Sequence, residues 1–160
     1  MGSGTAATRF IGVGMRDSST GPSCDWVGAG TWCVTFTRGI TPDEVLTRYG
    51  AAPRHARVMP MREADRLGAD SYRAGTTKSV LRVGAVGDWS FYYERWGVLG
   101  TMPGPLSALS HDTEMFTVTV GGDRMNTEHW HEGRCTEVFE PSRPDTRRLS
   151  PHPWWDAVQE

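Results

Sequence analysis

The feature that most constrains the fold is a set of short runs in which apolar and polar residues alternate. In the first run, Trp32, Val34 and Phe36 alternate with Cys33 and threonines. A second run, over residues 116–120, alternates Phe and Val with Thr. Successive side chains of a strand point to opposite faces of a sheet, so this period of two predicts half-buried β-strands.

Two further pairs of runs are predicted to form hairpins. Residues 80–83 and 89–95 are rich in β-branched and aromatic side chains, and they flank the glycine-containing turn at 84–88. Near the end of the chain, two more extended segments are joined through Glu132-Gly133. Glycine beside a polar residue between two such runs is typical of a hairpin turn.

The helices are predicted to be few and short. Thr41 and Glu44 have the spacing of a capping box, Pro42 suits the first helical position, and Gly50 suits the end. A second short helix is expected over residues 60–69, and a single helical turn over 106–109. The pattern therefore predicts an α+β fold, a mostly antiparallel sheet of about five to six strands with one or two short helices packed on one face.

The chain has 160 residues, a length at which one domain is the default expectation. Residues 1–24 are rich in Gly, Ser and Thr and are predicted to form a flexible N-terminal tail. Residues 25–141 are predicted to form the single α+β domain. Residues 142–160 are predicted to form a Pro-rich C-terminal arm, which Trp154 and Trp155 would dock.

Composition argues against several classes of partner. The formal net charge is −2, so the chain lacks the positive field that attracts nucleic acid or an anionic membrane surface. The opening residues lack the pattern of a secretory signal, and we expect a cytoplasmic protein. The three cysteines are widely spaced, which favours unpaired buried thiols over a zinc site. Nucleotide-binding fingerprints are absent from the sequence, so no cofactor is expected.

Three segments carry a resemblance to a known family: "TWCVTFTRGITPDEVLTRYGA", "VLRVGAVGDWSFYYERWG" and "TEMFTVTV". Over residues 26–141, the chain resembles an actinobacterial family of small proteins catalogued as a domain of unknown function. The resemblance implies an architecture and names no reaction. More loosely, the aromatic strand that follows Gly87 is similar to segments of small bacterial immunity and regulatory domains.

The pair His129 and His131 is the one candidate metal site in the sequence. Side chains two apart on a strand share a face, so both imidazoles could reach one ion. A two-residue turn would place His131 opposite Arg134 and His129 opposite Thr136. Trp130 then lies on the other face, together with Cys135, Glu137 and Phe139. We expect that face to meet the core, which would leave both histidines in solvent.

A second candidate site is the aromatic strand 89–95. If Trp89, Phe91 and Tyr93 face inward, then Tyr92 and Glu94 face outward. The predicted binding surface consists of Tyr92, Glu94, Trp96 and Trp130.

Two functions remain open at this point. The first is a non-catalytic protein-binding module, immunity-like or regulatory, because Trp and Tyr anchor interfaces and the sequence offers no catalytic set. The alternative is a small enzyme or ligand-binding protein, metal-assisted through His129 and His131. The pattern assigns no catalytic residue.

Overall fold

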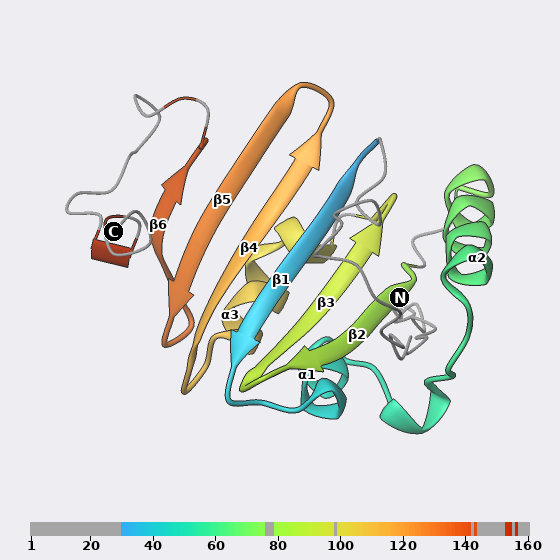
Figure 1. Cartoon of the computed structure of the whole chain (residues 1–160), viewed down its shortest axis with the longest axis horizontal. Coiled ribbons are helices and arrows are strands. Elements are labelled where there is room, and N and C mark those ends of the chain that lie inside the picture. The colour runs from blue at the N-terminus through green and yellow to red at the C-terminus, as the bar shows by residue number, and fades with distance from the viewer. Residues whose placement is uncertain are drawn as a thin grey trace, which may run out of the picture.

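The computed structural model describes residues 30–75, 79–97, 99–141, 143, 153, 154 and 156; the predicted N-terminal tail, 1–24, lies outside them. Within the described residues, six strands form one antiparallel sheet in the order β2-β3-β1-β4-β5-β6 (Figure 1). The strands are β1 (Trp32–Arg38), β2 (Leu81–Val86), β3 (Trp89–Arg95), β4 (Glu114–Gly121), β5 (Arg124–His131) and β6 (Arg134–Phe139).

Two of the helices cover one face of this sheet, and a third lies at its edge. The helical elements are α1 (Pro42–Arg48), η2 (Pro53–His55), α2 (Met61–Arg73), η3 (Leu99–Thr101) and α3 (Pro103–Leu109). Figure 1 shows α1 and α3 behind the sheet and α2 standing beyond β2 at its edge. The predicted α+β class and the antiparallel sheet with helices on one face are confirmed.

Helix α1 begins where the sequence predicted. The backbone N–H of Glu44 donates to Thr41 Oγ1 at 3.2 Å, and Pro42 occupies the first helical position. The Glu44 side chain does not return to the cap; its Oε1 accepts from Arg48 Nε at 2.9 Å. Gly50, with φ of 78°, follows the helix in the left-handed conformation that glycine adopts without strain.

The main core lies between the sheet and helices α1 and α3. Val45 and Leu46 of α1 and Leu106 and Leu109 of α3 are all fully buried there. From the sheet they meet Cys33, Leu81, Val83, Tyr92, Met115 and Trp130. Each fully buried Leu or Val side chain contributes roughly 1.5–3 kcal/mol to stability.

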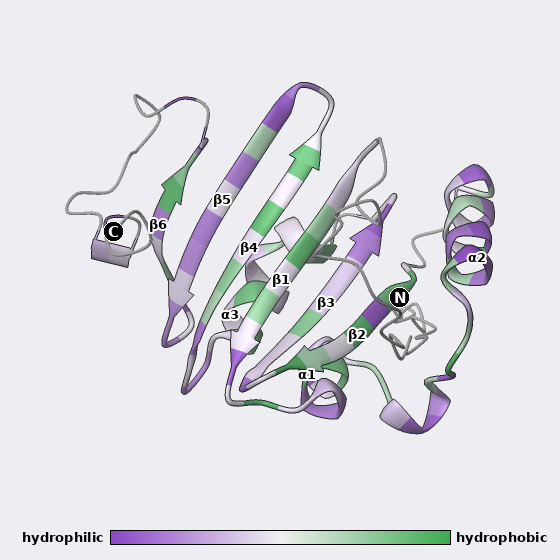
Figure 2. Cartoon of the chain, in the orientation of Figure 1, coloured by the Kyte–Doolittle hydropathy of each residue, from purple (hydrophilic) through white to green (hydrophobic). Residues whose placement is uncertain are grey.

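Helix α2 differs from the other two. It runs from Met61 to Arg73, longer than the predicted 60–69, and Figure 2 shows it largely hydrophilic. Its buried residues are Ala64 and Gly68. Ala64 and the partly buried Leu67 of α2 pack with Met59 and Val80 in a small separate cluster. None of the helices described is long and apolar enough to cross a membrane.

Candidate functional site

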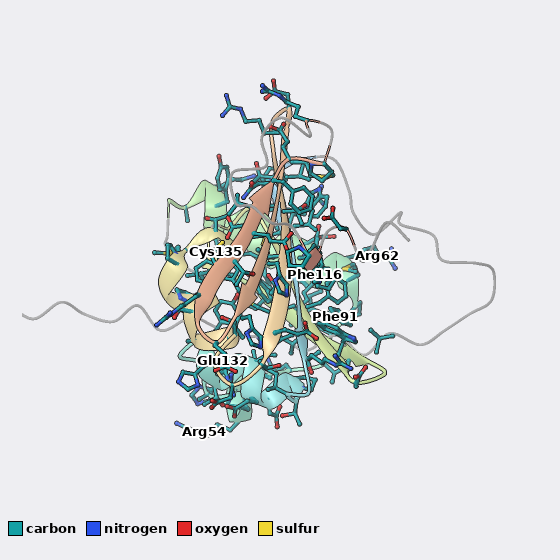
Figure 3. The ribbon with its side chains drawn as sticks, turned by 90° about the vertical axis from the view of Figure 1, so that its left-hand side faces the viewer. Arg54, Arg62, Phe91, Phe116, Glu132 and Cys135 are labelled. Carbon is teal, nitrogen blue, oxygen red and sulfur yellow. The ribbon has the colours of Figure 1, made fainter. Side chains whose placement is uncertain are left out.

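The face of the sheet turned away from α1 and α3 carries an array of aromatic rings, which we call the open face. Its centre is Phe36 of β1, flanked by Phe91 of β3 and Phe116 of β4 in the strand register. The Phe36 and Phe116 rings stack with centroids 4.9 Å apart, and the Phe36 and Phe91 centroids are 6.1 Å apart. All three side chains are half-buried. Figure 3 views the sheet edge-on and labels Phe91 and Phe116 on this side.

The rim of the open face adds a tryptophan and a set of charges. Trp89 meets the Phe116 ring edge-on at 5.7 Å, and the Arg38 guanidinium lies 5.9 Å from the Trp89 centroid. Arg38 also pairs with Asp88 at 3.2 Å and with Glu114 at 2.9 Å. The open face is therefore apolar at its centre and charged at this end.

The sequence predicted the opposite orientation for β3. Tyr92 is 1% exposed and Glu94 is 0% exposed, both on the helix-covered face. The Tyr92 ring packs edge-on against Tyr49 of the α1 C-cap at 4.6 Å, and Glu94 Oε2 accepts from the Gly100 backbone at 3.2 Å. The prediction that these side chains face outward is wrong. The apolar residues of α1 and α3 pack against the Tyr92 side of the strand.

The four residues of the predicted binding surface do not lie together on one exposed patch. Trp130 is 7% exposed and belongs to the same buried core as Tyr92. Trp96 is half-buried at the α2 edge, where its ring lies 5.6 Å from that of Tyr72 and 5.2 Å from the Arg95 guanidinium. A partner could contact Trp96 directly, but not the other three.

The late hairpin is paired as predicted at its turn and differently beyond it. Glu132 and Gly133 have φ of 51° and 75°, as a two-residue type I′ turn requires, and His131 pairs with Arg134. A bulge follows, because Trp130 pairs with Cys135 while His129 pairs with Glu137.

The bulge leaves Thr136 without a partner across the ladder, whereas the sequence predicted that it pairs with His129. The extra residue moves Glu137 and Phe139 to the face that His129 occupies. The prediction that both lie with Trp130 is therefore wrong.

The bulge also changes the surroundings of the two histidines. His131 is exposed, as predicted, but His129 is only 9% exposed, which corrects the prediction that both face solvent. Thr136 Oγ1 donates to the His129 carbonyl at 3.1 Å and lies 2.7 Å from Nδ1. The donor in the second contact depends on the tautomer of the imidazole. Nε2 faces Glu114 Oε2 at 3.7 Å.

Burial lowers the pKa of His129 below its ordinary value, against the attraction of Glu137 and Glu114. The neutral imidazole is therefore the favoured form at neutral pH. A neutral ring presents an apolar face to whatever stacks on it.

Trp154 of the C-terminal segment covers this end of the open face. Its ring stacks on His129 with centroids 5.0 Å apart and an interplanar angle of 10°, and it lies 5.4 Å from the Phe116 ring. Its backbone N–H donates to Glu137 Oε1 at 2.7 Å. Trp154 is one of the two residues expected to dock the arm; the other, Trp155, lies outside the described residues.

Metal and thiol chemistry find little support in the described ranges. There, the structure holds no group of three His, Cys, Asp or Glu side chains placed to bind a metal ion. Cys33 and Cys135 are unpaired thiols; burial raises the pKa of both, that of Cys135 to about 11. A raised thiol pKa disfavours the thiolate that a nucleophile needs. Cys24 lies outside the described residues.

Sequence reasoning missed Phe36 and Phe116 as candidate site residues. One signal was available in Gly84, because a Cβ at this position would lie 2.6 Å from Phe91 Cζ. A glycine inside a strand often marks such a close approach.

Comparison with known proteins places the chain in a family without placing it near a characterised protein. No curated protein and no solved structure matches the chain. A family model matches residues 24–159, which includes the sheet, the helices and the segment that carries Trp154. The chain belongs to the family of unknown function DUF6461.

Proposed function

We propose that the protein is a non-catalytic binding module that docks a polypeptide segment on its open face by seating a tryptophan side chain there. The proposal keeps the protein-binding role expected from the sequence. It moves the contact surface from Tyr92 and Glu94 to the opposite face of the same strand.

The observation that carries the proposal is the contact site of Trp154 on His129, Phe116 and Glu137, which we call the seat of Trp154. The open face holds this indole by stacking on His129 and by contact with Phe116, and a Glu137 carboxylate oxygen accepts from the backbone N–H of the same residue. The backbone of Trp154 is helical, and ring contact together with a backbone hydrogen bond fixes both the aromatic anchor and the backbone that carries it. The C-terminal segment that carries Trp154 is therefore the template for the ligand that we propose.

The rest of the open face extends the same chemistry. Phe36 of β1 and Phe91 of β3 continue the aromatic array that begins at Phe116. Trp89 lies at the end of the array, next to Arg38. Rigid aromatic side chains give large contact area with little loss of conformational entropy, which suits a docking surface.

The test uses a synthetic peptide with the sequence of residues 150–158 as the probe. We expect it to bind the Trp154→Ala protein more tightly than the wild type, whose seat is filled by its own arm. In the Trp154→Ala background, Phe116→Leu keeps apolar volume but removes ring contact, and it should weaken binding about tenfold. Isothermal titration calorimetry measures both effects.

The matched control is Tyr72→Leu in the same background. It makes the same change, aromatic to leucine, at a residue that is 63% exposed on α2 and away from the seat. It should leave peptide affinity unchanged. Equal affinity of all three variants, or no difference between wild type and Trp154→Ala, would remove the open face as the docking surface.

A further inference from the structure

His129 is a titratable side chain that lies beneath the Trp154 indole. It is 9% exposed, although it belongs to the face of the sheet that neither α1 nor α3 covers. The Trp154 ring stacks on one face of the imidazole, with centroids 5.0 Å apart and an interplanar angle of 10°. At the edge of the imidazole, Nδ1 lies 2.7 Å from Thr136 Oγ1. The indole is therefore part of what separates this ring from water.

The second ring nitrogen of His129 is where the surroundings respond to a proton. Nε2 is buried and has no hydrogen-bond partner in the described part of the chain. Glu114 Oε2 lies 3.7 Å away, near enough for an ion pair but too far for a hydrogen bond. A protonated imidazole would therefore be a cation that neither water nor a close carboxylate solvates while the indole covers it.

The charged groups that act on His129 belong to the sheet. Glu114 of β4 and Glu137 of β6 attract a charged imidazole, and His131 of the same strand opposes the charge. Arg38 of β1 pairs with Glu114 Oε1 at 2.9 Å and so reduces that attraction. All of these groups remain in place when the C-terminal segment leaves, so they attract the imidazolium whether the seat is filled or empty.

The indole distinguishes the filled seat from the empty one. Removing water from an ion costs more than the attraction that an indole face offers a cation. Burial is accordingly the largest influence on His129, and it lowers the pKa of this side chain below the ordinary 6.5. Uncovering the ring restores water to it and raises the pKa. The empty seat therefore binds a proton at pH values where the filled seat does not, and acid favours the empty seat.

We propose that protonation of His129 empties the seat, so that the open face holds a tryptophan side chain at neutral pH and releases it in mild acid. The inference rests on the proposed docking function and adds the regulation of that same site. It applies to the chain's own arm and to a docked partner alike, because both place an indole on the same imidazole. Histidine suits this role because its charge changes between pH 5 and pH 8.

The first experiment needs no peptide. NMR of the full chain follows the nuclear Overhauser contact between the Trp154 and Phe116 rings from pH 7.5 to pH 5.5, together with the ring signals of His129. We expect the contact to weaken steadily toward pH 5.5. In Trp154→Ala the imidazole should titrate at a higher pH than in the wild type, because its cover is gone. An unchanged titration midpoint, or a contact of equal strength at both pH values, overturns the proposal.

The second experiment uses the peptide of residues 150–158 and the Trp154→Ala protein. Isothermal titration calorimetry should show about tenfold weaker binding at pH 5.5 than at pH 7.5. Adding His129→Phe keeps an aromatic ring that cannot titrate, so the affinity should no longer depend on pH. The matched control is His131→Phe, the same change at an exposed position of β5, which should keep the tenfold loss.

The outcomes separate this inference from the docking function. A pH dependence that persists in His129→Phe belongs to Glu114, Glu137 or His152 of the peptide, and it overturns the proposal. Equal affinity at both pH values overturns it as well, yet leaves the docking function standing. Absence of binding at either pH removes the docking function instead. The titration of His129 in Trp154→Ala still decides the inference then, and it requires no histidine variant to fold.

Discussion

Glu94 is a carboxyl group sealed inside the core. It is 0% exposed and packs beneath η3, where Oε2 accepts from the Gly100 backbone at 3.2 Å. Burial raises its pKa above the ordinary value of 4.5, and hydrogen bonds from Ser79 and from the Gly100 backbone only partly oppose this. The native state therefore holds this proton at pH values where the unfolded chain has released it.

The raised pKa of Glu94 predicts a loss of stability with rising pH. From about pH 4.5 upward the unfolded chain releases the proton and the native state keeps it, so the stability contributed by the neutral carboxyl falls until the folded pKa is passed. Glu94→Gln has no such proton. We expect its free energy of unfolding, relative to that of the wild type, to rise between pH 4.5 and pH 8, measured by urea titration.

The control for this prediction is Glu132→Gln, which neutralises an exposed carboxylate in the β5–β6 turn. Its stability should follow the wild type across the same series. Parallel curves for wild type and Glu94→Gln would show that Glu94 is ionised in the native state.

At the scale of the elements, η3 packs closely against the sheet. Gly100 lies directly over β1 and β3, with its carbonyl accepting from Cys33 Sγ at 3.5 Å. A Cβ at this position would fall on Tyr92 Oη and Cys33 Sγ. The short helix can lie this close to the sheet only because residue 100 has no side chain.

Gly100→Ala should therefore destabilise the protein by about 1–3 kcal/mol, the usual cost of overpacking a filled core. Gly104→Ala in α3 is the matched control, because a Cβ there meets nothing within 4 Å. Chemical denaturation of both variants tests the prediction. If both are as stable as the wild type, η3 is not packed as tightly as described.

At the scale of the whole molecule, the largest apolar cluster of the described residues lies on one side of the sheet. Helices α1 and α3 share a continuous apolar layer with β1, β3 and β4, whereas α2 depends on a small separate cluster. Neither α1 nor α3 covers the open face, although Val34, Tyr93 and Phe139 are buried there. Regions with few buried apolar contacts open at lower free energy than the core.

This division predicts that the longer helix is the less protected one. Amide hydrogens of α2, which has 13 residues, should exchange with deuterium sooner than those in the second half of α1, which has 7. The reason is that Val45 and Leu46 fix α1 to the core. Hydrogen exchange followed by mass spectrometry gives the order, and slower exchange in α2 than in α1 would contradict it.

The sequence by itself determined the elements. Alternation predicted the strands, Thr41 and Pro42 predicted the start of α1, and Glu132-Gly133 predicted the last turn, because each signal depends on neighbours a few residues apart. Which side of β3 meets the core was decided only by tertiary structure. Both sides of that strand carry aromatic rings, and alternation is equally satisfied when the two faces are exchanged. The choice depended on where α1 and α3 pack, just as the surroundings of His129 depended on one extra residue in β6 and on a tryptophan more than twenty positions away.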